Sequence, residues 1–225
     1  MKKYIIGMIA LLCFEIAGAQ EYRSFCAGPY LGFKAGLNGG NVMDGRKNAM
    51  NIARVPEFGV NSLLILSNEY DLGACFGLGY ADYSYKIKGY AVGREYKCNY
   101  SYLNLTTELY FQGITMGFAF GYPLAADFGS EIDADKLGFM SEFKIGYIYP
   151  VMLDLEEGAS LNLYINAGYM LTGIFKDYAN DDPLLPFVPA VPPQTSSSKY
   201  NPRVVSITIG MSYWFGIHQV SEPAE

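Results

Sequence analysis

Hydrophobic and polar residues alternate with a period of two along eight segments of the chain, as expected for β-strands with one apolar and one polar face. In the last segment, Val205, Ile207 and Ile209 alternate with Ser206 and Thr208. The polar faces repeatedly carry glycine, which suits the narrow interior of a small barrel. The eight expected strands lie near residues 30–37, 57–66, 70–85, 103–111, 114–121, 142–147, 161–172 and 205–215.

The connections between these segments alternate between short and long. Short connections lie around Asn68, at Gln112-Gly113 and at Leu153–Gly158. Short turns at one end and long loops at the other are typical of a transmembrane β-barrel, with the turns in the periplasm. The sequence therefore predicts an all-β fold, an eight-stranded antiparallel transmembrane β-barrel with an up-and-down meander. The long connections are expected at Asn38–Val55, Lys86–Glu95, Pro123–Gly138 and Lys176–Asn201.

Two details of the strands refine this prediction. The alternation of the third strand changes phase near Asp82, where a β-bulge is expected. Aromatic residues at strand ends fit the interfacial girdles of a membrane barrel. These aromatic residues are Tyr122, Tyr149, Tyr169 and Tyr213. The alternative is a soluble β-sandwich or lipocalin-like barrel, whose exterior would be polar and whose apolar faces would form the core.

The N-terminal segment has the features of a signal peptide. Lys2-Lys3 precede the apolar run Tyr4–Phe14, which is too short to cross a membrane as a helix, and Ala17–Ala19 matches a cleavage pattern. We therefore expect export and a location in the bacterial outer membrane. The expected organisation is a signal peptide at 1–19, a periplasmic segment at 20–27, the barrel at 28–216 and a polar periplasmic tail at 217–225.

Composition narrows the functional classes. The net charge of −6 and the lack of a basic run argue against binding to nucleic acid. No run after Ala19 approaches the length of an apolar transmembrane helix. We expect Cys26, Cys75 and Cys98 to be free thiols, because Cys75 should lie opposite about Leu105 rather than opposite Cys98. Their spacing does not match a metal site.

Several short motifs resemble those of the small OmpA-like and PorT-like outer-membrane barrel proteins of Bacteroidetes. The motifs are Gly32–Asn38, Tyr102–Leu105 with Glu108-Leu109, Gly168-Tyr169 and Gly210–Phe215. The resemblance implies a porin-family barrel and raises a role as an accessory to secretion. Phe215 is followed by Gly216–Glu225 rather than ending the chain, so the assembly signal would be internal.

Four charged residues are expected to point into the barrel. Two acids and two bases in a narrow interior are best accommodated as mutual ion pairs, because unpaired buried charges are costly. The favoured interpretation is a structural network that fills the lumen, and the alternative is a gated polar plug or binding cluster. The four residues are Lys34, Glu108, Glu142 and Lys144.

Catalysis is not expected. The single histidine, His218, lies beyond the last strand, so a hydrolytic triad at the outer rim would lack its base. An acidic loop is interpreted as solvated, since its spacing does not match an EF-hand. Its acids are Asp127, Glu131, Asp133 and Asp135. No metal and no cofactor are expected.

The last long loop is rich in proline, and pre-extended proline-rich backbone loses less entropy when it docks on a partner. The loop is a candidate recognition site, although it is also explained as a stiff cover over the barrel mouth. Its central residues are Pro183, Leu184, Leu185, Pro186, Phe187, Val188 and Pro189. The expected role is structural or surface interaction, with outer-membrane lipid and lipopolysaccharide as partners and an extracellular protein or glycan as a further candidate. Alternatives are a narrow or gated pore and, less favoured, a lipid- or glycan-modifying enzyme.

Overall fold

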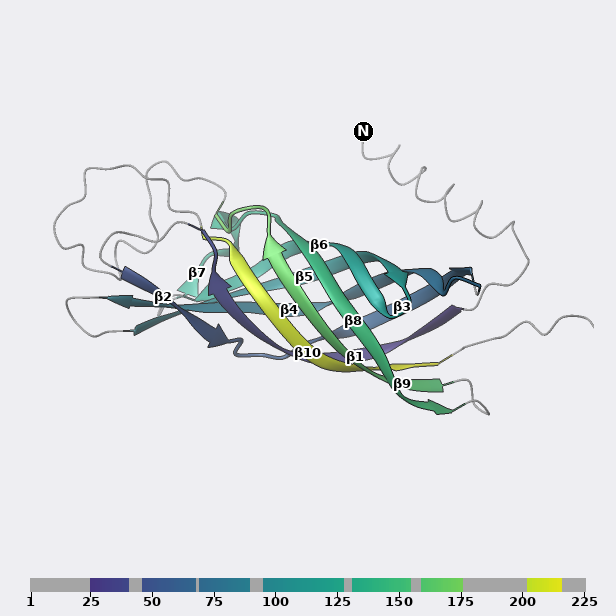
Figure 1. Cartoon of the computed structure of the whole chain (residues 1–225). Helices are drawn as coiled ribbons and strands as arrows, with labels where there is room; N and C mark the ends of the chain where they lie inside the picture. Colours follow the sequence, from purple (N-terminus) through teal and green to yellow (C-terminus); the bar gives the residue numbers. More distant parts are fainter. Residues whose placement is uncertain are drawn as a thin grey trace, which may run out of the picture.

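The computed structural model describes residues 25–40, 46–67, 69–89, 95–127, 131–154, 159–175 and 202–215. Within these ranges the chain forms a single antiparallel sheet of ten strands and one short 3₁₀ helix, η1 (Figure 1). The signal-peptide, tail and proline-rich-loop predictions fall outside the described residues. The elements are β1 (Phe25–Asn38), β2 (Arg46–Ile52), β3 (Glu57–Ser67), β4 (Leu72–Gly89), β5 (Glu95–Phe111), β6 (Ile114–Asp127), β7 (Glu131–Ile132), η1 (Ala134–Lys136), β8 (Met140–Asp154), β9 (Ala159–Met170) and β10 (Val204–Trp214).

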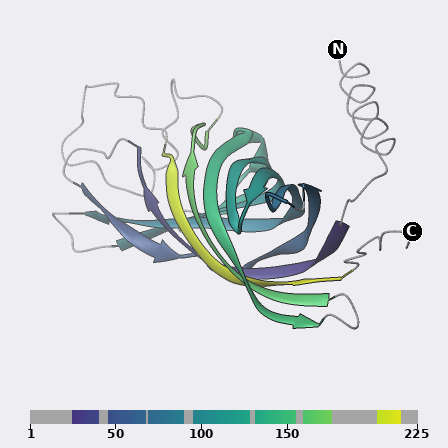
Figure 2. The same ribbon diagram turned by 45° about the vertical axis from the view of Figure 1, so that its right-hand side comes forward.

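The sheet closes on itself through its first and last strands. β1 pairs with β10 over nine residue pairs, from Tyr30 opposite Ser212 to Asn38 opposite Val204. Figure 2 shows β10 (yellow) running beside β1 (purple). The antiparallel pairings run in an unbroken circuit, β1–β3–β4–β5–β6–β8–β9–β10 and back to β1. The predicted all-β antiparallel meander is confirmed.

The second position of this circuit is shared by two strands. β3 pairs with β1 from Glu57 onwards, and β2 continues along β1 with Ile52 opposite Ala35. Residues 53–56 interrupt what would otherwise be one strand. This break and the two-residue β7 are why the described sheet counts ten strands, of which eight close the circuit. The expected count of eight strands is therefore not confirmed.

The connections differ from the expected ones at the long-loop end. The predicted loop 38–55 contains β2, and β4 and β5 extend so far that only residues 90–94 separate them. β7 and η1 occupy part of the predicted loop 123–138. The short turn at Gln112-Gly113 is confirmed, with φ angles of 48° and 85°. Such positive angles at both central residues are those of the type I′ hairpin turn.

The two faces of the closed sheet have opposite character. β10 alternates strictly between buried and exposed residues, and its buried positions carry the expected inward residues Ser206, Thr208 and Ser212. The outward residues are large and apolar, with 57% of Ile209 and 63% of Phe33 exposed. The same alternation holds over most of the circuit. The exterior is thus apolar and the interior polar in the middle of the sheet.

Apolar side chains fill the interior near its two ends. At the short-turn end, Trp214 packs with Cys26, Leu63 and Cys75. At the long-loop end, a larger group gathers inward-facing tyrosines of β4 and β5 with residues of the opposite strands and loops. We call this group the tyrosine cluster. Its members are Ala81, Tyr83, Tyr85, Ile87, Cys98, Tyr100, Tyr102, Ala126, Ile132, Leu137, Met140, Met170, Ile174, Phe175 and Val204.

The expected bulge near Asp82 is wrong. β4 and β5 stay in one register from Leu72 opposite Phe111 to Lys88 opposite Glu95. Alternation is lost there because residues 81–85 are buried on both faces of the hairpin. One face carries the tyrosine cluster, and the other carries polar residues covered by the break at 53–56. The irregularity therefore lies in the neighbouring strand and not in β4.

Candidate functional site

The charged residues of the interior lie between the two apolar ends, and the first pair joins β1 to β3. Lys34 Nζ lies 2.9 Å from Glu57 Oε2, with only 2% and 6% of the two side chains exposed. The other carboxylate oxygen of Glu57 accepts a hydrogen bond from the Tyr164 hydroxyl at 3.2 Å. Tyr164 reaches Glu57 by packing over Gly32 and Gly210, where a Cβ atom would collide with its ring.

A second pair joins β8 to β5. Lys144 Nζ lies 3.6 Å from Glu108 Oε1, with 13% and 9% of the side chains exposed. At this distance the two groups form an ion pair without a hydrogen bond, and Glu108 Oε1 has no hydrogen-bond partner among the described residues. The looser geometry distinguishes this pair from the close contact of Lys34 with Glu57.

The third acid, Glu142, is held by hydroxyl groups rather than by a lysine. Its Oε2 accepts a hydrogen bond from the Tyr83 hydroxyl at 2.7 Å, and its Oε1 accepts one from Ser206 at 2.9 Å. Lys34 Nζ lies 3.9 Å from the centre of the Tyr83 ring, a cation–π contact. Tyr83 therefore links the Lys34–Glu57 pair to Glu142 and to the tyrosine cluster.

All four predicted lumenal charges lie in this interior layer, although their pairing needs a fifth residue. Glu57 was not among the predicted lumenal charges because it is the first residue of its strand, next to the break. A signal was present, since Glu57 lies at the same period of two as Gly59 and Asn61, which are small and polar. With Glu57 included, the layer holds three acids and two lysines.

A cavity of about 60 Å³ lies beside the charged pairs, with room for a few water molecules. Thr115 and Ser212 are almost fully buried in its wall, and in the part of the chain that the structure describes neither hydroxyl has a hydrogen-bond partner. Buried hydroxyl groups of this kind favour a polar occupant, because leaving them unpaired costs free energy. Other polar residues of the wall are Tyr30, Glu57, Asn61, Thr106, Glu108, Lys144, Tyr164 and Asn166.

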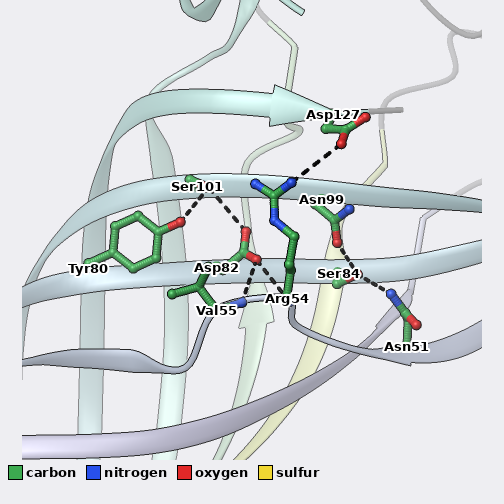
Figure 3. Close-up of polar contacts among 9 residues, drawn as sticks. All are labelled: Asn51, Arg54, Val55, Tyr80, Asp82, Ser84, Asn99, Ser101 and Asp127. Carbon is green, nitrogen blue, oxygen red and sulfur yellow. Dashed lines mark hydrogen bonds and ion pairs between the residues drawn. The ribbon is translucent and has the colours of Figure 1, made fainter. Parts of the chain in front are cut away.

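A second polar group lies on the other face of the β4–β5 hairpin (Figure 3). Asp82 is fully buried, and its Oδ2 accepts the backbone amides of Arg54 and Val55 at 3.1 and 3.3 Å. Its Oδ1 accepts a hydrogen bond from Ser101, whose hydroxyl in turn accepts one from Tyr80. Asp82 thus satisfies the backbone donors that the break in the second strand leaves without sheet partners.

The remaining candidates from the sequence are spread over other parts of the molecule or fall outside the described ranges. Of the acidic loop, Asp127 forms an exposed ion pair with Arg54 at 3.6 Å. No group of three metal-ligating side chains occurs among the described residues. The three cysteines are free, and Cys75 lies opposite Glu108, not opposite Leu105 as expected. The recognition loop around Pro183–Pro189 and the histidine at 218 lie outside the described residues.

Comparisons with known proteins find one weak structural similarity. No protein-family model and no curated protein matches the chain. Among solved structures, the outer membrane protein OprG from Pseudomonas aeruginosa is similar, with a TM-score of 0.39 and 11% identity over 87% of this chain and 97% of that one. A likeness at this level carries no argument about function. Among the described residues, no helix is long and apolar enough to cross a membrane.

Proposed function

We propose that this chain is an outer-membrane β-barrel with a structural or surface-interaction role and no catalytic activity. The observation that supports insertion is the inverted polarity of the closed sheet. Ion pairs lie inside, while large apolar side chains stand exposed on every strand of the circuit. Monomeric soluble proteins rarely expose a contiguous apolar surface of that extent, whereas the hydrocarbon of a bilayer would cover it.

Closure of the sheet supports the same proposal. A bilayer offers no hydrogen-bond partners to backbone groups, so a spanning sheet must have no free edge. The nine pairs between β1 and β10 meet this requirement. The signal-peptide pattern at residues 1–19 supports export to the envelope. Outer-membrane lipid, including lipopolysaccharide, would then be the immediate partner.

The filled interior favours a structural or interaction role over transport. The Trp214 group occupies the short-turn end, the charged layer the middle and the tyrosine cluster the long-loop end. Ion flow would require all three to rearrange, including the close Lys34–Glu57 pair. We therefore expect the folded protein to be silent in a planar bilayer.

The cavity favours one alternative, a narrow gated pore. It places unpaired hydroxyl groups and the loose Lys144–Glu108 pair beside each other in the middle of the interior. In that case, displacement of either apolar end would connect the cavity to solvent. Stepwise conductance of the purified protein would support the pore and contradict the closed structural barrel.

The test of insertion is electrophoresis of envelope fractions with and without boiling. A compact band found in the outer-membrane fraction, which migrates more slowly after heating, is the expected result. A protein recovered in the soluble fraction without a heat-dependent shift would contradict the proposal. Bilayer recordings on the same purified, heat-modifiable protein then separate the closed barrel from the pore.

A further inference from the structure

The end of the β4–β5 hairpin and β2 form a three-stranded extension of the closed sheet, toward the left of Figure 1. In this extension Lys47 lies opposite Lys88, which lies opposite Glu95. In the next row Ala49 lies opposite Lys86, which lies opposite Lys97. Side chains of directly opposed residues, and of every second residue along a strand, share one face.

Four lysines and one glutamate therefore lie on the same face of this extension. We call it the lysine face, defined by Lys47, Lys86, Lys88, Lys97 and Glu95. Lys47, Lys88, Lys97 and Glu95 are exposed, and Lys86 is partly exposed. The opposite face of the hairpin carries Tyr85, Ile87 and Cys98, which are buried in the tyrosine cluster. The lysine face is consequently the solvent face, and it carries a net charge of +3 on a chain whose net charge is −6.

The acidic residues described in this extension are Glu95, which contacts two of the lysines, and the buried Asp82. Glu95 contacts Lys88 at 2.6 Å and Lys86 at 3.8 Å. The hydrogen bond and charge of Lys88 are the main reasons why the pKa of Glu95 lies below its ordinary value. Asp82, on the same face closer to the closed sheet, is buried under the amides of Arg54 and Val55. Glu95 is thus shared between Lys88 and Lys86, which lie in two successive rows.

The register makes this concentration of charge unfavourable for folding. Like charges directly opposite each other on neighbouring strands destabilise a sheet, and here Lys86 faces Lys97. A flat, exposed arrangement of several ammonium groups is complementary to a partner that carries several phosphates. Binding such a partner would offset the repulsion.

The location of the lysine face indicates the source of the phosphates. Tyr80 and Leu103 form an outward aromatic and apolar row, and Lys86 with Lys97 lies six residues further along the strands. Six residues correspond to roughly 20 Å along a strand. With a strand tilt near 45°, this is roughly 14 Å along the membrane normal. We propose that the lysine face binds the phosphorylated sugars of lipopolysaccharide molecules in the surrounding outer leaflet.

This inference rests on the proposed membrane location and can fail separately from it. The test measures binding of labelled lipopolysaccharide to the full-length protein in mixed detergent micelles. Replacing Lys86 and Lys97 by glutamine should weaken binding on the order of twentyfold, about fivefold for each lysine near an anionic surface. The difference in binding between the native protein and this variant should become smaller when the salt concentration is raised, because salt screens exposed charges. Lipopolysaccharide stripped of phosphate should bind the native protein and the variant alike.

Matched variants control for net charge. The double variant Lys136→Gln and Arg203→Gln removes two positive charges near the same end of the sheet and should bind like the native protein. Glu95→Gln raises the charge of the lysine face and should tighten binding.

Equal binding by native protein and the Lys86/Lys97 variant would overturn the inference, provided that both show the heat-dependent shift. If the Lys86/Lys97 variant lost binding of polyglutamate while lipopolysaccharide did not bind to the lysine face, the inference would be overturned in favour of an acidic protein partner. If the native protein showed no heat-dependent shift in electrophoresis, this result would instead contradict the membrane location.

Discussion

Lys34 and Glu57 form the tightest ion pair of the interior layer, with 2.9 Å between Nζ and Oε2 and both side chains almost fully buried. Removing one partner of such a pair leaves an uncompensated charge, which is more costly than removing both. We expect Glu57→Gln to lower the free energy of unfolding by about 3 kcal/mol. Urea unfolding of the micelle-folded protein, followed through the single tryptophan, Trp214, measures this change.

The control for this prediction is the double variant Lys34→Met and Glu57→Met. It removes both charges and should lose less stability than Glu57→Gln alone, because apolar residues of similar volume often replace a buried pair at little cost. A double variant that is less stable than the single one would contradict the view of this pair as a charge-compensation device.

The hydroxyl group of Tyr83 should contribute to the stability of the protein, and that of Tyr102 should not. The Tyr83 hydroxyl donates to Glu142 and accepts from Asn104, while the Tyr102 hydroxyl has no hydrogen-bond partner in the described ranges. Both side chains are fully buried. Tyr83→Phe should cost about 1–3 kcal/mol, and Tyr102→Phe should be close to neutral. Equal effects in the same unfolding assay would refute the assigned hydrogen bonds.

Two interior glycines should respond differently to the same small substitution. A Cβ atom at Gly117 would run into the backbone of Thr107 and Glu108, whereas at Gly77 the nearest atom is the Thr106 Cβ at 3.6 Å. Gly117→Ala should therefore destabilise the protein by about 1–3 kcal/mol through overpacking. Gly77→Ala should be neutral or stabilising by up to about 1 kcal/mol, since alanine reduces the entropy of the unfolded chain. The temperature at which half of the compact gel band is lost, measured for each variant, ranks their stabilities.

Asp82 should stabilise the backbone of residues 53–56, where the second strand of the circuit is interrupted. Asp82→Ala removes the acceptor of the Arg54 and Val55 amides, at a cost of about 1–3 kcal/mol. Hydrogen exchange at these two amides, measured by NMR in micelles, should accelerate. Asp127→Asn serves as the control, because its ion pair with Arg54 is exposed and worth under about 1 kcal/mol. Unchanged protection of both amides in Asp82→Ala would exclude this role.

Alternation predicted the fold best where each strand has one face in the interior and one outside. The inward set of β10, including Ser206, Thr208 and Trp214, follows directly from the period of two. The same reasoning failed near Asp82, because β4 and β5 are buried there on both faces and neither face needs to differ in polarity. β2 was missed for another reason, since the glycine, asparagine and charged residues of the segment 38–55 are typical of a loop.

The charged layer was predicted in its members but not in its pairing. Facing direction follows from alternation within one strand, so Lys34, Glu108, Glu142 and Lys144 could be placed inside. Pairing depends on the register between strands and on how far each side chain reaches across the interior. Glu142 shows the limit: hydroxyl groups of Tyr83 and Ser206 hold it, although two lysines lie in the same layer. The lysine face likewise became visible only through the cross-strand register of β2, β4 and β5.

The pairing of β1 with β10 has a consequence for the order of events during assembly. Leu31 is held against Met211, so the first strand to be synthesised finds one of its two neighbours only after the last has been made. Until then β1 exposes an unpaired backbone edge and apolar side chains, which are templates for aggregation. The nascent protein must therefore be shielded through its whole synthesis, and a chain truncated before residue 204 should be degraded rather than accumulate as a smaller barrel.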